Sequence, residues 1–197
     1  NQAANNGATP LLIASENGHV DVVGALLERG ADINKAANDG ATPLFIASQK
    51  GHEEVVRILV ERRANINQAK DTGSTPLFIA SQIGHVEVIR VLAERGADIN
   101  QARDNGATPL YIASQKDHVD VVRVLAERGA DINKAMNNGC TPLYIASEVG
   151  HVEVVRILVE RGADINKANN DGWTPLLIAS QEGHVKVVSI LTERGAD

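Results

Sequence analysis

Histidine and cysteine are the side chains of this 197-residue chain best suited to metal binding or nucleophilic chemistry. The six histidines stand at a constant spacing of 33 residues: His19, His52, His85, His118, His151 and His184. Imidazole is a common zinc ligand and a proton carrier near neutral pH. A residue that recurs once in each copy of a repeat is, however, better explained as part of the architecture of that repeat.

Distance argues against a shared metal site. Equivalent residues of adjacent stacked helices should lie about 8–10 Å apart, whereas a zinc ion needs each ligand nitrogen at about 2 Å. We therefore expect no metal, no cofactor and no catalytic residue, and we expect each histidine to bond nearby backbone where the second helix of its repeat begins. The neighbours Asp117 and His118 form the one candidate for a pH-sensitive pair. The sequence contains no phosphate-binding loop, nucleophile elbow or paired catalytic carboxylates, so we predict that it is not an enzyme.

Cys140 is the only cysteine, which rules out an internal disulfide and fits a reducing, cytoplasmic location. The corresponding positions of the other repeats include Ala107 and Ser74, so a tolerated small residue is the simplest explanation of this thiol. We expect Cys140 to be exposed, open to alkylation and able to form an intermolecular disulfide.

Composition limits the partners. The net charge of −6 disfavours a nucleic-acid surface, which needs a basic stripe. No apolar run approaches the ~20 residues of a membrane span, and no signal peptide is expected. Apolar residues make up 43% of the chain but aromatic residues only 3%, which is typical of a thin stack of small repeats. We expect a monomer.

The prolines share the 33-residue spacing and mark where a helix begins in each repeat: Pro10, Pro43, Pro76, Pro109, Pro142 and Pro175. In the second repeat, Thr42 can cap the first helix and Pro43 fits its first position. Gly51 is expected to end that helix in a left-handed conformation. His52 opens a second helix running to about Arg62, with its apolar residues on one face.

The motifs Gly-x-Thr-Pro-Leu-x-x-Ala, Gly-His and Gly-Ala-Asp-Ile-Asn, repeated every 33 residues, resemble the ankyrin repeat over the whole chain. The expected repeats are 4–36, 37–69, 70–102, 103–135, 136–168 and 169–197. The resemblance implies an all-α solenoid in which each unit has a hairpin-like turn and two antiparallel helices. It also implies that residues 1–197 form a single array whose concave face binds another protein or a peptide segment.

The chain departs from the family pattern in several places. The residue after Thr-Pro-Leu, commonly histidine in the family, is here Leu12, Phe45, Phe78, Tyr111, Tyr144 or Leu177. Arg63 and Asp117 replace glycines and should each cost roughly 1 kcal/mol if the backbone there is left-handed. Neither end has a distinct polar capping repeat. The first three residues match residues 34–36, so the sequence begins inside the pattern.

Comparison of the six repeats with one another separates shared architecture from residues that could carry a specific function. In the fourth repeat, Ala107, Tyr111 and Gln115 lie on one helix ridge, and the corresponding ridges carry every aromatic residue. We expect this ridge to face the partner, with cations beside it that suit acidic residues. The predicted partner-binding residues are Phe45, Phe78, Tyr111, Tyr144, Trp173, Lys50, Lys70, Arg103 and Lys116.

The alternative for the four Phe and Tyr rings is that they only fill the space between adjacent first helices. If they contact a partner instead, replacing Phe78 and Tyr111 by alanine should abolish capture and change the melting temperature by only a few degrees. For the whole chain, the leading hypothesis is a natural interaction module. Two further hypotheses are an engineered or consensus-like scaffold and a regulatory domain cut from a larger enzyme or scaffold. The irregular residues Arg63 and Asp117 favour a natural sequence.

Overall fold

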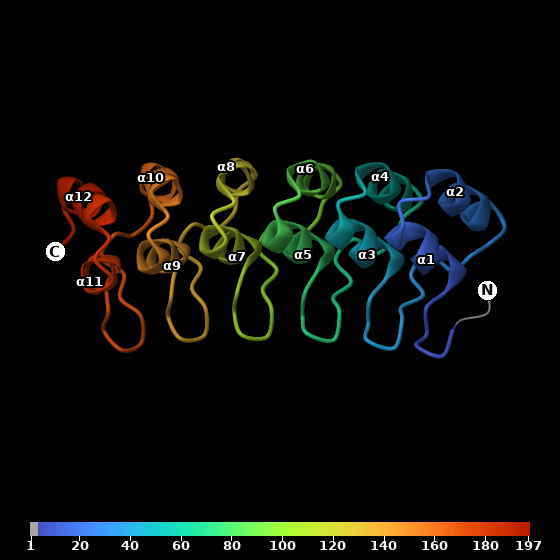
Figure 1. The fold of residues 1–197 in the computed structure, drawn as a ribbon, viewed down its shortest axis with the longest axis horizontal. Coiled ribbons are helices and arrows are strands. Elements are labelled where there is room, and N and C mark those ends of the chain that lie inside the picture. The colour runs from blue at the N-terminus through green and yellow to red at the C-terminus, as the bar shows by residue number, and fades with distance from the viewer. Residues whose placement is uncertain (1–3) are drawn as a thin grey trace. The chain divides into compact units, whose positions relative to one another are not determined.

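The computed structural model describes residues 4–197 and is all-α within that range, with twelve helices and no strand (Figure 1). The chain divides into two compact units, unit 1 ending at Arg103 and unit 2 beginning at Asp104. This confirms the predicted fold class of paired helices within each unit. The prediction of one continuous array concerns how the two units join and stays a prediction. The match of residues 1–3 to the repeat pattern lies outside the described residues.

Unit 1 contains three helix pairs. Its first helices are α1 (Pro10–Glu16), α3 (Pro43–Lys50) and α5 (Pro76–Ile83), and its second helices are α2 (Val20–Glu28), α4 (Glu53–Glu61) and α6 (Val86–Glu94). The first helices lie side by side in one row and the second helices in another, with the long turns extending beyond the first row (Figure 1). The apolar core lies between these two rows.

Unit 2 repeats the same arrangement. Its first helices are α7 (Pro109–Gln115), α9 (Pro142–Val149) and α11 (Pro175–Gln181), and its second helices are α8 (Val119–Glu127), α10 (Val152–Glu160) and α12 (Val185–Glu193). The leucine at the second position of α7 and α9 is almost completely buried, as is the last leucine of each second helix. These residues meet the same kind of neighbour in successive repeats.

The first helices begin and end as the Thr-Pro and glycine signals predict. The Thr42 backbone is extended, its Oγ1 accepts a hydrogen bond from the Phe45 N–H at 3.1 Å, and Pro43 occupies the first turn of α3. Gly51 ends α3 with φ 78°, and its N–H donates to the Ala47 carbonyl. The same Thr cap and Pro start recur in all six first helices.

Each second helix is stabilised by the burial of its one apolar face. In α4, Val55, Val56 and Leu59 are buried on one side of the helical wheel, whereas Glu54 on the opposite side is exposed. Because helices of nine residues are marginal by themselves in water, this buried face rather than intrinsic propensity maintains the helix.

Arg63 and Asp117 adopt left-handed backbone conformations, with φ 66° and 58°, where most other repeats have glycine. This confirms the prediction made for both positions. At Gly96, the equivalent of Arg63 in the next repeat, φ is 87° and an added Cβ would meet no described atom within 4 Å. The cost of a side chain at this position is therefore a cost of backbone conformation and not of collision.

We predict that Arg63→Gly stabilises the protein by about 1 kcal/mol and that the reciprocal change, Gly96→Arg, destabilises it by a similar amount. For a chain of this length the melting temperature should move by roughly 2–4 °C in each direction. Thermal and urea unfolding of both variants measure this, and a lower unfolding midpoint for Arg63→Gly would contradict the assigned strain.

Candidate functional site

Four of the histidines join their repeat to the preceding repeat of the same unit. In unit 1, His52 Nε2 lies 2.9 Å from the Glu16 carbonyl oxygen and His85 Nε2 lies 3.1 Å from that of Gln49. Unit 2 has the same contacts: His151 with Gln115 at 3.1 Å and His184 with Glu148 at 2.9 Å. A carbonyl oxygen only accepts, so Nε2–H is the donor. The predicted architectural role is confirmed, and the bonded backbone belongs to the preceding repeat.

A glycine lies directly beneath three of these four rings. A Cβ added to Gly51 would lie 2.7 Å from His85 Nδ1, and one added to Gly150 would lie 2.6 Å from His184 Nδ1. In the fourth repeat Asp117 takes this place, and its Oδ1 lies 3.7 Å from His151 Nδ1. The neighbour of Asp117 across the junction is therefore His151 of the next repeat. The pairing of Asp117 with His118 stays a prediction.

Two features of residues 4–197 concern metal binding and membrane insertion. No group of three or more His, Cys, Asp or Glu side chains within this range is arranged to hold a metal ion. No helix in the same range is both long and apolar enough to cross a membrane.

The aromatic ridge is buried rather than open. Phe45, Phe78, Tyr111 and Tyr144 are all buried, Phe78 with only 1% of its surface exposed. Phe45 packs with Ala41 of its own repeat and Ile79 of the next. Burial also raises the pKa of the Tyr111 and Tyr144 hydroxyls. These four rings therefore present no open surface, and Phe45 fills the space between α3 and α5. This favours the packing alternative, and contact of the rings with a partner stays a prediction.

Two of the predicted partner-binding cations lie over these rings. Lys70 Nζ is 5.7 Å from the Phe45 ring centroid and 2.6 Å from Asp39 Oδ2. The hydrogen bond from Lys70 lowers the pKa of the Asp39 carboxyl. The Arg103 guanidinium lies 5.2 Å from the Phe78 centroid, and its Nε–H donates to the Thr72 carbonyl at 3.2 Å. Both cations therefore help to cover a ring of the preceding repeat.

The remaining predicted residues reach solvent. Lys50, at the end of α3, is about half exposed and lies 3.4 Å from Glu16 of the preceding repeat. Lys116, which follows α7, and Trp173, which precedes α11, are also exposed. These three side chains can meet another molecule without rearrangement of the chain.

Ile83 and Val149 are exposed apolar residues absent from the predicted partner-binding set. They end α5 and α9, and 45% and 44% of their surfaces are open to solvent. The position is among those that vary most between repeats: Asn17, Lys50, Ile83, Lys116, Val149 and Glu182. This variation could have identified Ile83 and Val149 from the sequence, because the other four side chains at this position are polar.

The ends of the first helices therefore carry one cation and one apolar side chain in each unit. In unit 1, α3 and α5 lie side by side and end in Lys50 and Ile83. In unit 2, the adjacent α7 and α9 place Lys116 and Val149 at the same positions. We name these four residues the helix-end surface. Neighbouring helices lie about 8–10 Å apart, so one bound segment can reach both residues of a pair.

Cys140 is buried, which contradicts its expected exposure. The residues at this position in the earlier repeats, such as Ala41 and Ala107, are buried as well. Burial raises the pKa of the Cys140 thiol. The small residues at this position reflect tight space, and cysteine fits because it is also small.

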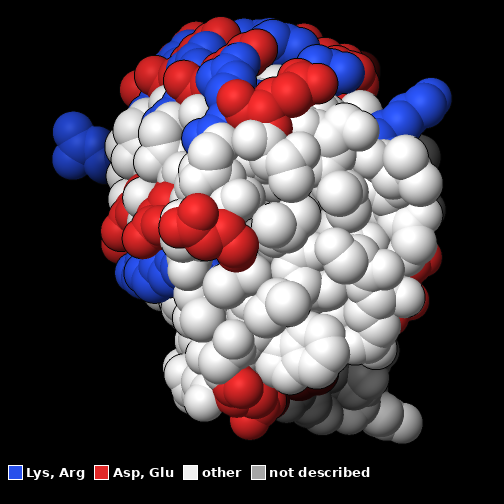
Figure 2. Space-filling view, turned by 90° about the vertical axis from the view of Figure 1, so that its left-hand side faces the viewer, with Lys and Arg blue, Asp and Glu red and all other residues white. Residues whose placement is uncertain are grey.

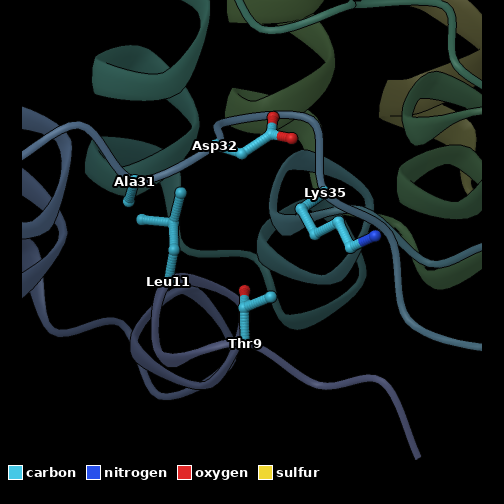
Figure 3. A pocket seen from close by; sticks show the side chains of 5 residues that line it. All are labelled: Thr9, Leu11, Ala31, Asp32 and Lys35. Atoms are coloured by element: carbon cyan, nitrogen blue, oxygen red, sulfur yellow. The ribbon is translucent and has the colours of Figure 1, made fainter. Parts of the chain in front are cut away.

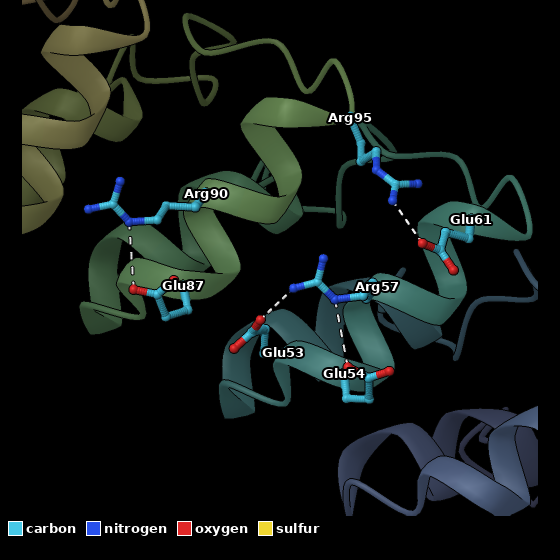
Figure 4. A network of polar contacts seen from close by, with 7 residues as sticks. All are labelled: Glu53, Glu54, Arg57, Glu61, Glu87, Arg90 and Arg95. Atoms are coloured by element: carbon cyan, nitrogen blue, oxygen red, sulfur yellow. Dashed lines mark hydrogen bonds and ion pairs between the residues drawn. The ribbon is translucent and has the colours of Figure 1, made fainter.

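The second helices of unit 1 carry a network of exposed ion pairs (Figure 4). Arg57 reaches Glu53 at 2.6 Å and Glu54 at 3.6 Å, and Arg90 Nε lies 3.6 Å from Glu87. Between repeats, Arg95 lies 2.7 Å from Glu61. Exposed pairs of this kind contribute little to stability, because water and salt screen them. They give the second helices a solvated face with few apolar anchors for a partner.

Figure 3 shows a hollow of unit 1 lined by Thr9, Leu11, Ala31, Asp32 and Lys35. The side-chain oxygens of Thr9 and Asp32 that line it already accept hydrogen bonds from nearby backbone N–H groups. Thr9 Oγ1 accepts from the Leu12 N–H at 3.2 Å, and Asp32 Oδ1 accepts from the Asn34 N–H at 3.0 Å. The hollow is therefore explained by helix capping and loop geometry.

A family model described as ankyrin repeats matches the chain in three copies, over residues 1–70, 63–136 and 134–197. These copies together span the sequence, and each covers about two of the 33-residue repeats. A comparison with curated proteins finds no match.

We predict that Phe45→Ala destabilises the protein by about 3–5 kcal/mol, because it leaves a cavity between α3 and α5. The control Ile83→Ala removes an exposed side chain and should change stability by less than about 0.5 kcal/mol. Urea unfolding measures both, and a Phe45→Ala variant as stable as the control would contradict the packing role of the ring.

We predict that Cys140 reacts with Ellman's reagent at least about tenfold more slowly in the native protein than in urea, because burial limits access and raises the thiol pKa. The rate of thionitrobenzoate release measures this. Equal rates in the native and unfolded states would show that the thiol is open.

Proposed function

This chain belongs to the ankyrin-repeat family, and on that premise we propose that it binds a partner protein on the side that carries its turns and first helices. Repeats of this family are generally protein-interaction modules. The side in question corresponds to the concave binding face that the family resemblance implies. The partner contacts proposed here begin with the helix-end surface of Lys50, Ile83, Lys116 and Val149.

The observation that carries this proposal is the exposure of Ile83 and Val149. Isolated apolar residues on a surface are ordinary, but these two occupy the same position in two repeats, and each follows a repeat with lysine there. Neither side chain serves the core of its unit. A pattern that recurs in both units at a variable position fits selection for a ligand rather than for folding.

The chemistry of the surface indicates the kind of partner. An apolar side chain of the partner can cover Ile83 or Val149, and an acidic side chain nearby can pair with Lys50 or Lys116. Because the repeats are rigid and already ordered, binding has little ordering cost on this side. An extended or helical segment with alternating apolar and acidic residues fits this description best.

Trp173 is a further proposed contact in unit 2. It is exposed at a position that is buried in the other five repeats, and exposed tryptophans are frequent anchors at interfaces. Lys70 and Arg103 stay in the proposed set as secondary contacts, because each already covers a ring. The four buried aromatic residues would act indirectly, by fixing the spacing of the first helices.

A random peptide library displayed on phage tests this proposal directly. We predict that selection on the wild-type chain enriches peptides with both acidic and apolar residues. A peptide bound through unit 1 should lose at least about tenfold in affinity for Lys50→Glu/Ile83→Glu, because each substitution removes an attraction and adds a like charge. A peptide bound through unit 2 should respond in the same way to Lys116→Glu/Val149→Glu. Fluorescence polarisation measures the affinities.

The matched control is Arg90→Glu, which reverses a charge on the second-helix face of α6. It should leave peptide affinity unchanged. Peptides that lose affinity for Arg90→Glu and keep it for both double variants would move the binding site to the second helices and contradict the proposal.

A further inference from the structure

The loop that follows α4 differs in charge from the corresponding loop of every other repeat. It reads Arg62-Arg63-Ala64-Asn65, so its two arginines and no acidic residue give a formal charge of +2. The other five loops read Arg-Gly-Ala-Asp, in which one arginine and one aspartate cancel. Two substitutions therefore shift the charge of one loop in the same direction, within a chain whose net charge is −6.

Arg63 is the first of these substitutions, and no contact within the fold explains it. Its φ of 66° lies in the left-handed region, and the five equivalent residues are glycines. The side chain is exposed, and no hydrogen bond or ion pair within residues 4–197 involves its guanidinium group. Residues with a strained backbone cluster at active sites and ligand-binding sites. The strain at Arg63 therefore points to a ligand outside the chain.

Arg62 also presents a guanidinium group without an acidic partner. Elsewhere acidic and basic side chains lie together, as along the upper edge of the view in Figure 2, which faces α11 and α12. In the repeat that follows, Arg95 lies 2.7 Å from Glu61 (Figure 4). The same offset would join Arg62 to Glu28, but the described part of the chain contains no ion pair or hydrogen bond between these two side chains.

Asn65 is the second substitution and adds a further hydrogen-bond donor. The equivalent aspartates bond their own loops: Asp32 Oδ1 accepts from the Asn34 N–H at 3.0 Å. Asp98 Oδ1 does the same for Asn100 at 2.9 Å. The Asn65 side chain makes no such bond within residues 4–197. Its backbone N–H donates to Asn34 Oδ1 at 2.7 Å, which fixes the loop against the preceding repeat and leaves the amide of Asn65 able to donate to an anion.

Donors of these kinds fit a phosphate group. A guanidinium group is planar and donates two parallel hydrogen bonds to carboxylate or phosphate oxygens. A phosphorylated side chain brings a charge of about −1.5 to −2 and three acceptor oxygens in one compact group. A long acidic segment would instead have to approach a chain of net charge −6, with Asp32 and Asp98 in the neighbouring loops. The concentrated charge of a phosphate therefore fits this loop better.

Two other anionic surfaces fit the loop less well. Recognition of a membrane by charge takes clusters of about four to eight cations, and nucleic acids need a basic stripe. The loop has only two cations. Its one apolar side chain, Ala64, is buried and cannot insert into lipid.

We propose that Arg62, Arg63 and Asn65 form a phosphate-binding site in unit 1, which takes a phosphorylated side chain of a partner protein. The two guanidinium groups pair with the phosphate oxygens, and the Asn65 amide donates a further hydrogen bond. The conformational strain at Arg63 is retained because the site needs a second cation in this loop.

This site is separate from the helix-end surface. Only Gly51 and His52 connect α3 to α4, which makes the two helices an antiparallel pair. The end of α4 therefore lies at the opposite end of the pair from Lys50. The phosphate site does not depend on the partner contacts proposed above.

A degenerate library of phosphoserine peptides tests the proposal, with the affinity of selected peptides measured by fluorescence polarisation. The wild type should bind a selected peptide at least about tenfold more tightly than the same peptide without its phosphate. Arg63→Gly should lose at least about tenfold in affinity while its melting temperature rises, as predicted above. These opposite effects separate a binding role from a structural one. Arg62→Gln/Arg63→Gly should lose binding altogether, and Asn65→Asp should weaken it by adding a like charge.

The pH dependence gives a second readout. The second pKa of a phosphate monoester is about 6. Lowering the pH from about 7.5 to about 5.5 should therefore weaken binding, because the phosphate gains a proton and loses charge. An affinity that does not change over this range would contradict binding of the dianion.

The matched controls are Arg90→Glu and Lys50→Glu/Ile83→Glu, neither of which alters the loop. Both should keep full affinity for the phosphopeptide, so a failure of the helix-end surface as a binding site would leave this result unchanged. A library that yields no peptide dependent on Arg62 and Arg63 would overturn the proposal. Equal binding of a peptide with glutamate in place of phosphoserine would also overturn it and indicate an acidic segment. Arginine-dependent binding to phosphatidylserine vesicles without binding to phosphopeptides would assign the loop to membranes instead.

Discussion

The constraint on which the rest of the structure depends is that no repeat buries its own apolar face. Two short helices leave one side open, and only the neighbouring repeat can cover it. The junction combines a ring or leucine from one first helix, an isoleucine from the next, and a histidine that donates to a carbonyl of the preceding repeat. Glycine lies beneath that histidine because a Cβ would collide with the ring. His52, His85 and His184 lie over Gly18, Gly51 and Gly150 for this one physical reason, whereas Asp117 takes the place of the glycine at His151.

This constraint also decides where function can lie. Side chains in the junction, including the four Phe and Tyr rings, are committed to packing and leave little surface for another protein. Residues at the ends of the first helices lie outside it and vary freely. Lys50, Ile83, Lys116 and Val149 differ between repeats because no neighbouring repeat dictates them. The proposed partner surface is thus the part of the first-helix side that stacking leaves free.

Much of the fold could be predicted from the sequence because turn and cap signals are local. Thr42-Pro43 and Gly51 set the limits of α3, and the position of Arg63 in the repeat predicted its positive φ. Burial was harder to predict, because helical spacing shows which residues share a ridge but not whether a neighbouring helix covers it. The expected exposure of Cys140 was wrong for this reason. For Cys140 a usable signal existed: a position that is small in five repeats indicates limited space.

The most direct measurement of the central claim compares two alanine substitutions at equivalent glycines. Gly51 and Gly183 have nearly the same backbone, with φ 78° and 76°, but an added Cβ lies 2.7 Å from the His85 ring at Gly51 and meets no described atom within 4 Å at Gly183. Gly51→Ala and Gly183→Ala should therefore cause the same backbone strain. The difference between their unfolding free energies measures the effect of disturbing the contact between Gly51 and the next repeat. If junctions hold the stack, Gly51→Ala should cost roughly 1–3 kcal/mol more than Gly183→Ala at low protein concentration. Equal costs would contradict this account.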